Sequence, residues 1–550
     1  MMCLVPVNGQ ESAARDVAST PRDAALARSA SGFGRRLVLA LAWLTPLLLL
    51  GGVGACSHDV EEGGREPVSE ARAGNVILIS LDTLRADRLE AYGYGRPTSP
   101  NLAALGSRSV VFRNAHAQAP QTAPSHASLF TSEYPGAHGI INVHGASPQM
   151  HTLPAGVRTL AERLSAGGLE TAAFVSGGNL TRHMQMDRGF DVWDETNEDA
   201  SGRIDELLKW MHAPDRGRFF AVLHTYQVHA PYLPPRELVG PFTDPAYSGP
   251  LRERLDRYLE LPAGDAWKGA VGPDYWAGML DYTEADVRFL SDLYDAEIAY
   301  LDTQVRRVLE AVLTTDLAAD TAIVLISDHG EEFRDHGKYQ HDQVFEELIR
   351  VPLMVKLPNA LEQQGWKGVV DAPVQLIDVA PTIAELAGVD WSDAGWEGRS
   401  LVPALDPSVR DASPLGMRPV FSELTIDPGP KKYRTVIVDG WKYIHAWQAG
   451  IDVTWEWLFD LKNDPGENRN LIRCEQGQAP LQRERLRQLL TAFAQANDAK
   501  AAVLGQAGTA EVDDASLQEL EQLGYVGGGG DEPLQDAGSG SDGPPPDDCP

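Results

Sequence analysis

Short apolar runs alternate with longer amphipathic segments between residues 75 and 388. The runs are rich in Val, Ile and Leu, as in buried strands, and they lie at 75–81, 171–175, 218–223, 321–327 and 352–356. The longer segments read as helices, and they lie at 97–107, 157–166, 285–312 and 376–388. This alternation predicts an α/β fold in which a large central β-sheet is flanked by helices.

A different pattern follows Gly388. Short strand-like segments joined by turns precede a helical segment near 480–499, and they lie at 420–423, 433–440, 441–444 and 457–460. They predict a small C-terminal antiparallel-sheet subdomain at 391–526, after a main domain at 74–390. Residues 230–282 are rich in Pro, Tyr, Trp and charge, which predicts a long insertion near the entrance to a site.

The ends of the chain have their own composition. Arg35 and Arg36 precede the apolar stretch 37–50, and small residues then lead to Cys56. This order predicts a bacterial lipoprotein-type signal peptide at 1–56 with lipidation of Cys56, a polar tether at 57–73 and a disordered tail at 527–550. An uncleaved membrane anchor and an ordinary signal peptide are the alternatives. We therefore expect an exported protein, lipid-anchored at the bacterial cell envelope, periplasmic or surface-facing.

Length and charge narrow the class of protein. A chain of 550 residues with 43% hydrophobic residues can bury a large core. Its formal net charge of −31 argues against nucleic acid as a partner, because a polyanion would be repelled. The four cysteines do not indicate a disulfide framework.

Acidic residues follow two of the buried runs. Asp82 comes directly after the run at 75–81, and Asp328 with His329 comes after the run at 321–327. The carboxyl ends of strands are where open α/β sheets place their chemistry, so these side chains predict a shared metal site. The alternative is that Asp82 and Asp328 only cap helices.

A third motif lies at 121–132, Gln-Thr-Ala-Pro-Ser-His-Ala-Ser-Leu-Phe-Thr-Ser. With this motif the chain resembles the sulfatase family of the alkaline phosphatase superfamily, which carries Cys/Ser-x-Pro-x-Arg and a helix at this place. Further segments follow in family order: Tyr134-Pro135, His138-Gly139, His224, His229 to Tyr232, Asp328 to Glu331, His336-Gly337, Glu346-Glu347, Arg350 to Leu353, Asp378 to Thr382, Leu458 to Leu461 and Asp464 to Glu467. The resemblance covers about residues 75 to 525. It implies an alkaline-phosphatase-like sheet with a small C-terminal subdomain.

The resemblance also implies a ligand set for one divalent metal ion, which consists of Asp82, Thr122, Asp328 and His329. Many sulfatases have a second carboxylate after the first Asp and an Asn after the later one, and such oxygen shells suit calcium. Here Thr83 and His329 stand at those positions. An imidazole ligand favours Mn²⁺, Zn²⁺ or Fe²⁺, with Mg²⁺ as the alternative, over Ca²⁺.

Thr122 stands where sulfatases convert Cys or Ser into formylglycine. Threonine cannot follow that route, because a sulfated threonine lacks the second hydroxyl that expels sulfate. A phosphorylated threonine has no such difficulty, since water or an acceptor alcohol can attack the phosphorus. The resemblance therefore implies Thr122 as the nucleophile, with phosphate-type esters favoured; Thr122 as a helix cap is the alternative role, and Ser125 is the alternative nucleophile.

Three histidines complete the catalytic residues that the resemblance implies. His126 replaces the family Arg, so a titratable donor stands in place of a permanent charge. His229 is the family's candidate proton donor to the leaving oxygen, and His341 lies about where a substrate-contacting Lys is common. The alternatives are structural roles, or a second metal ion held by His224, His229, His336 and His341.

The sequence thus predicts a metal-dependent hydrolase of sulfate or phosphate mono- or diesters, acting on a small-molecule, glycan or lipid ester. Its partners would be that substrate and the membrane that holds its lipid anchor. Two other functions stay open: a transferase of phospho-alcohol head groups, and a catalytically inactive surface binding protein.

Overall fold

The structure is a computed structural model that describes residues 72–142, 149–196, 199–260, 282–408, 415, 418–426, 431–448, 453–523 and 525. All of them belong to one structural unit, Arg65–Pro550. The predicted signal peptide, nearly all of the predicted tether and the predicted tail lie outside the described residues.

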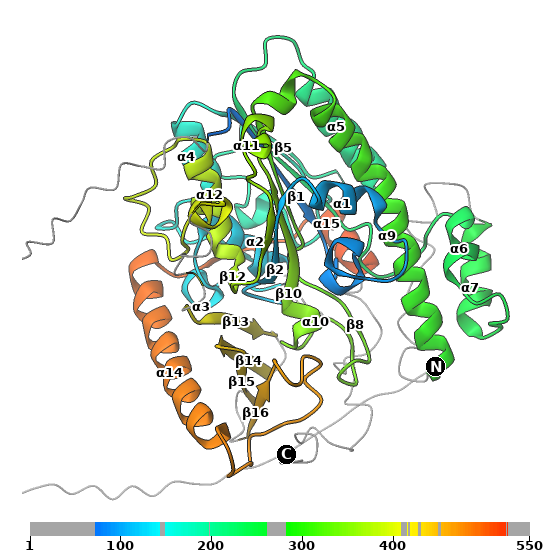
Figure 1. Cartoon of the computed structure of the whole chain (residues 1–550), viewed down its shortest axis with the longest axis vertical. Coiled ribbons are helices and arrows are strands. Elements are labelled where there is room, and N and C mark those ends of the chain that lie inside the picture. Colours follow the sequence, from blue (N-terminus) through cyan, green and yellow to red (C-terminus); the bar gives the residue numbers. More distant parts are fainter. Residues whose placement is uncertain are drawn as a thin grey trace, which may run out of the picture. The chain divides into compact units, whose positions relative to one another are not determined.

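The centre of the fold is a nine-stranded mixed sheet (Figure 1). Its strands follow the order β11 (Gly368–Val370), β2 (Val110–His116), β10 (Arg350–Lys356), β7 (Thr321–Ile326), β1 (Asn75–Leu81), β6 (Phe219–Thr225), β4 (Glu170–Phe174) and β5 (Val192–Asp194), and β12 (Val374–Gln375) pairs with β2. β1 pairs in parallel with both β6 and β7, while β10 is antiparallel to its neighbours.

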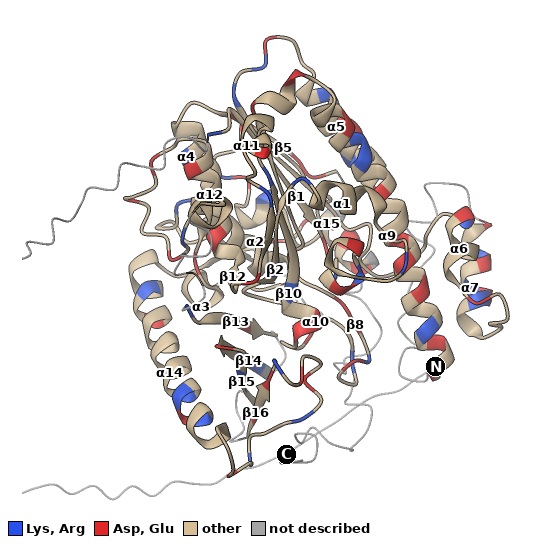
Figure 2. Ribbon diagram, viewed as in Figure 1, with Lys and Arg blue, Asp and Glu red and all other residues tan. Residues whose placement is uncertain are grey.

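Helices cover both faces of this sheet because its central strands are apolar on both sides. Along β1, Val76 and Leu78 pack with one group of helices, and Ile77 and Ile79 pack with the other, which is the alternation expected of a strand. The first group is α2 (Thr122–Thr131), α4 (Leu160–Ala166) and α12 (Val379–Leu386), and the second is α1 (Pro100–Gly106), α5 (Ala200–Met211) and α9 (Glu284–Leu313). Figure 2 shows charged residues mainly on helices and loops, with the central strands mostly uncharged. The predicted α/β class is confirmed.

A smaller antiparallel sheet follows, with the order β13 (Val420–Thr425), β14 (Lys431–Val438), β15 (Trp441–Gln448) and β16 (Thr454–Asp460). Helix α14 (Ala479–Leu504) packs on it through Leu486, Leu490 and Phe493. These elements are the C-terminal antiparallel-sheet subdomain that the sequence predicts.

The chain then returns to the large domain. β17 (Gly508–Glu511) pairs with β3 (Gln149–Thr152), and helix α15 (Asp514–Gln522) places Leu520 in the core beside α2 and α4. The end of the described chain therefore belongs spatially to the central sheet, although it follows the small sheet in sequence.

The remaining described elements are short. The insertion contains α6 (Arg236–Phe242) and α7 (Pro250–Leu259), and α6 packs on α9. The others are α3 (Pro135–His138), α10 (Glu346–Ile349), α11 (Asn359–Gln363), α13 (Val402–Leu405), β8 (Glu332–Phe333) and β9 (Tyr339–Gln340). Within the described part of the chain, no helix combines the length and the apolar character needed to cross a bilayer.

We predict that Leu78→Ala in β1 lowers the free energy of unfolding by about 2–5 kcal/mol, because the central strand cannot collapse around the cavity. Leu78 is fully buried, whereas Leu481 on α14 is 70% exposed. Urea denaturation should therefore show a change within about 0.5 kcal/mol for the control variant Leu481→Ala. Equal effects of the two substitutions would contradict the assigned burial of β1.

Candidate active site

Parallel pairing brings three strand ends together. In the register of the sheet, Ser80 of β1 lies opposite His224 of β6 and Ile326 of β7. The residues that follow these strands, Asp82 and Asp328 among them, therefore emerge at one edge of the sheet, as the sequence predicts.

Thr122 is the first residue of α2 and is fully buried. Gln121 is the N-cap residue of α2, and its side chain makes no capping hydrogen bond. Instead, the side chain of Asn142 caps the start of the helix, because its Oδ1 accepts from the backbone N–H of Ala123 at 2.8 Å. The alternative of Thr122 as a helix cap is wrong, because its hydroxyl turns to the strand ends.

The hydroxyl of Thr122 lies among the other predicted metal ligands. It donates to Asp82 Oδ2 at 3.3 Å and lies 3.5 Å from His329 Nε2. His329 Nε2 is also 3.5 Å from Asp328 Oδ2. The four predicted ligands are therefore brought together.

Each of the two carboxylates has one oxygen that is held and one that is not. Asp328 Oδ1 accepts from the backbone N–H groups of Thr83 at 3.3 Å and His329 at 3.0 Å, and Asp82 Oδ2 accepts from Thr122 and His224. Asp82 Oδ1 and Asp328 Oδ2 are buried and accept no hydrogen bond. Neither carboxylate caps a helix, and the two unpaired oxygens suit a cation between them.

The pKa of Asp82 also favours a cation beside its carboxylate. Burial and the neighbouring carboxylate of Asp328 raise the pKa of Asp82 well above its usual range. A divalent cation would remove this repulsion, because it attracts both carboxylates.

The tautomer of His329 also suits a metal. Its Nδ1–H donates to the carbonyl of Gly330 at 3.0 Å, so the Nε2 lone pair faces Asp328 and Thr122. Burial lowers the pKa of His329, although Asp328 opposes this, and a lowered pKa favours the neutral ring that coordination requires. One imidazole together with carboxylate and hydroxyl oxygens is a donor set that can hold a divalent metal ion.

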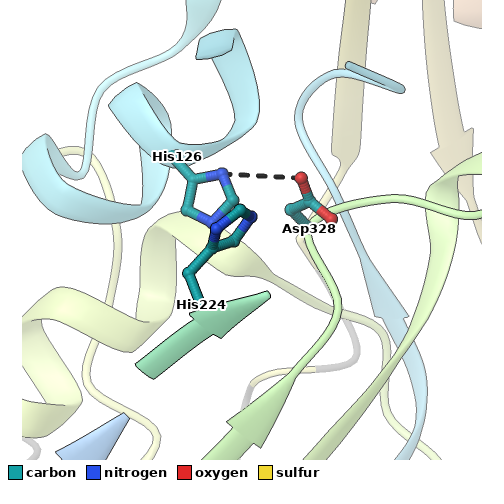
Figure 3. Close-up of side chains that lie close together, drawn as sticks. All are labelled: His126, His224 and Asp328. Carbon is teal, nitrogen blue, oxygen red and sulfur yellow. Dashed lines mark ion pairs between the residues drawn. The ribbon is translucent and has the colours of Figure 1, made fainter. Parts of the chain in front are cut away.

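His126 lies beside Asp328 and His224 (Figure 3). From α2, its Nδ1–H donates to the carbonyl of Thr122 at 2.9 Å, and its Nε2 accepts from the hydroxyl of Ser80 at 2.9 Å. The same Nδ1 is 3.5 Å from Asp328 Oδ2. His224, on β6, packs edge-on against His126 and donates from Nε2 to Asp82 Oδ2 at 3.1 Å. Both histidines therefore hold parts of the ligand set in place.

His229 and His341 meet at one phenol. The Nε2 atoms of His229 and His341 lie 3.2 and 3.1 Å from the hydroxyl of Tyr525, and the two rings pack 5.3 Å apart. The sequence reasoning missed Tyr525 as a site residue. Its only signal was that the family-like segments continue to Leu523–Val526, and nothing local connects that segment with His229, almost 300 residues earlier.

The other predicted residues lie in separate interactions. His336 stacks on Phe345, and its Nδ1 lies 2.5 Å from Glu347 Oε1; burial lowers its pKa, but this partner outweighs burial and raises it to about 9. The hydroxyl of Ser125 donates to the carbonyl of Asp328 at 2.7 Å. Arg85 forms an ion pair with Asp87 at 2.8 Å.

Three groups of acidic and histidine side chains are close enough to share a cation in the described part of the chain. They are Asp82 with Asp328 and His329; His126 with His224 and Asp328; and Glu332 with His336 and Glu347. The structure therefore divides the four histidines suggested for a second metal ion among three different places.

Comparison with known proteins shows what the chain as a whole is similar to. The family model described as Sulfatase matches residues 74–389, and that of the N-sulphoglucosamine sulphohydrolase C-terminal region matches 334–495. The choline-sulfatase of Rhizobium meliloti (strain 1021) is 26% identical over 451 residues, which cover 73% of this chain and 83% of that enzyme.

Two solved structures share the fold. One is a protein in complex with its substrate D-glucosamine-2-N,6-O-disulfate, with a TM-score of 0.62, 20% identity and coverage of 78% of this chain and 99% of that one. The other is the phosphonate monoester hydrolase of Agrobacterium radiobacter, with a TM-score of 0.59, 22% identity and coverage of 77% and 96%.

We predict that His329→Asn binds Mn²⁺ or Zn²⁺ at least about 100-fold more weakly and gains affinity for Ca²⁺, because an amide oxygen replaces the imidazole. Asp328→Ala should abolish binding of all three ions. Metal analysis after dialysis measures both effects. His116→Asn is the control, since His116 is a buried histidine paired with Glu346 and should leave the metal content unchanged. Calcium in the unmutated protein would contradict the ligand argument.

Proposed function

The chain belongs to the sulfatase family of ester hydrolases, and we propose that it cleaves phosphate-type esters with the hydroxyl of Thr122 as the nucleophile. The observation that carries this proposal is the position of that hydroxyl. It lies at the N-terminus of α2, 3.3 Å from Asp82 Oδ2 and 3.5 Å from His329 Nε2.

The side chain at position 122 decides between sulfate and phosphate. In the proposed reaction the Thr122 oxygen bonds to phosphorus, the bond from phosphorus to the ester oxygen breaks, and the alcohol leaves. Water then attacks phosphothreonine and releases phosphate, which restores the hydroxyl. A sulfated threonine has no comparable exit, because it lacks the geminal hydroxyl that expels sulfate from formylglycine.

Asp82, Thr122, Asp328 and His329 would hold the divalent metal ion. When bound, the ion supplies positive charge that lowers the pKa of a hydroxyl and stabilises phosphoryl oxygens. The N-terminus of α2 adds a favourable potential for the anion that develops at Thr122.

The histidines around this set take separate roles. His126 and His224 hold the backbone of Thr122 and the carboxylate of Asp82. In the proposed reaction His229 and His341 serve the departing ester oxygen, because an imidazole suits the role of the acid there. Burial and the neighbouring His341 lower the pKa of His229 to about 4 in the free site, so His229 takes up a proton only when negative charge arrives there.

Position in the cell follows from the N-terminal segment. We propose that Cys56 carries lipid at the mature N-terminus. This lipid would anchor the catalytic unit at the bacterial cell envelope, facing the periplasm or the cell surface. The substrate would then be an exported small molecule, glycan or lipid ester. The order of basic, apolar and small residues before Cys56 supports this proposal.

We predict that Thr122→Ala lowers kcat by roughly 10⁴- to 10⁶-fold and leaves the melting temperature and most of the metal affinity intact, because three ligands remain. Thr122→Ser should keep measurable turnover, since it keeps the hydroxyl. Assays with 4-nitrophenyl phosphate, bis(4-nitrophenyl) phosphate, a phenylphosphonate ester and 4-nitrophenyl sulfate measure the effect.

The variant Ser125→Ala tests the alternative nucleophile. It should lower kcat less than Thr122→Ala does, because the Ser125 hydroxyl already donates to the backbone carbonyl of Asp328. The reverse order would move the nucleophile to Ser125. Multiple-turnover sulfatase activity above all phosphate-type activities would overturn the substrate class.

We predict that mass spectrometry of the membrane-extracted protein finds an acylated N-terminal Cys56, and that Cys56→Ala prevents acylation. An unmodified protein that begins at another residue would contradict the anchor.

A further inference from the structure

The last described residue, Tyr525, lies inside the candidate active site, and its side chain is 7% exposed. Its hydroxyl is the point where the Nε2 atoms of His229 and His341 converge, at 3.2 and 3.1 Å. One oxygen thus contacts both histidines.

The phenol is held in this place by several interactions of the C-terminal segment. The Asp513 side chain caps α15 and pairs with His183 at 2.9 Å. Glu519 Oε2 accepts from the backbone N–H of Gly178 at 2.9 Å, and Leu520 is fully buried in the core. The backbone N–H of Tyr525 then donates to the carbonyl of Leu520 at 2.9 Å. Tyr525 is therefore part of the folded domain, held by the segment that precedes it and by its own backbone N–H.

The hydrogen bonds of the phenol leave a clear place for an ester oxygen. The Nδ1–H of His229 donates to the carbonyl of Ala230 at 2.5 Å, so its Nε2 is an acceptor and takes the phenol proton in the free protein. An ester oxygen bound beside the two imidazoles would lie next to this phenol, because the phenol oxygen is 3.2 and 3.1 Å from their Nε2 atoms. It can replace the imidazole nitrogen as the acceptor of that proton.

We propose that Tyr525 is a catalytic residue whose O–H donates a hydrogen bond to the departing ester oxygen. Negative charge builds up on that oxygen as its bond to phosphorus breaks, and a donor fixed in a buried site stabilises this charge more than water does. The donation forms no covalent bond and transfers no proton. This inference rests on the proposed function, because it assigns the leaving side of the same reaction.

Tyr525→Phe in the full-length, metal-loaded protein tests the proposal, since it keeps the buried ring and removes only the hydroxyl. We expect kcat for phenyl phosphate to fall about 10²- to 10³-fold, the range for loss of one such donor. For 4-nitrophenyl phosphate the loss should be much smaller, because the nitrophenolate spreads its charge and needs less help. The ratio of the two losses does not depend on how much enzyme is folded, so partial unfolding cannot imitate the result.

Tyr92→Phe is the matched control. The Tyr92 hydroxyl is also bonded within the protein, to the carbonyls of Phe112 and Leu353 at 3.2 Å, but it lies between β2 and β10 and should not change the ratio. Unchanged rates in Tyr525→Phe, or equal losses for the two substrates, would overturn the assignment.

The same experiment separates this inference from the proposed function. If Thr122→Ala is inactive and Tyr525→Phe is unimpaired, only the role of Tyr525 fails. If the protein turns over sulfates alone, the proposed substrate fails, and the ratio is measured with phenyl sulfate and 4-nitrophenyl sulfate instead. A greater loss for phenyl sulfate would then still support Tyr525.

Discussion

The repulsion between two buried carboxylates is the constraint on which the active site depends. Asp82 and Asp328 follow neighbouring parallel strands, and each is fully buried with one oxygen that accepts no hydrogen bond. Burying such a pair without a counter-charge is costly, so the site is arranged to receive a cation. The backbone amides on Asp328 and the imidazole of His224 on Asp82 hold the other oxygens, which leaves the free ones directed to the same place.

The first turns of α2 bring two polar side chains into the site. Thr122 places a hydroxyl at the start of the helix, while His126 uses both ring nitrogens on Ser80 and on the backbone of Thr122. His126 therefore supports the backbone of Thr122 and not a group outside the protein. On the other side, His229, His341 and Tyr525 form a second polar group, so the reacting atoms would lie between two layers of fixed donors and acceptors.

Local sequence was enough to predict the sheet and the first part of the site. The runs that became β1 and β7 are apolar and β-branched, and Asp82, Asp328 and His329 follow them directly, so their convergence required only that parallel strands end at one edge. The link between His224 and Asp82 could not be predicted in the same way, because it depends on the register of β6 against β1. The position of Tyr525 was still harder to predict from the sequence. It depends on the packing of α15 against the large domain after the chain has completed the small subdomain.

That return has a consequence for the order in which the protein becomes competent. The strands that carry the carboxylates are made early in synthesis, yet His229 and His341 find their phenol partner only when residue 525 has emerged. A chain that lacks residue 525 therefore lacks the phenol between His229 and His341, even when the strands that carry the carboxylates are complete. This part of the site is assembled from segments that are synthesised far apart in time.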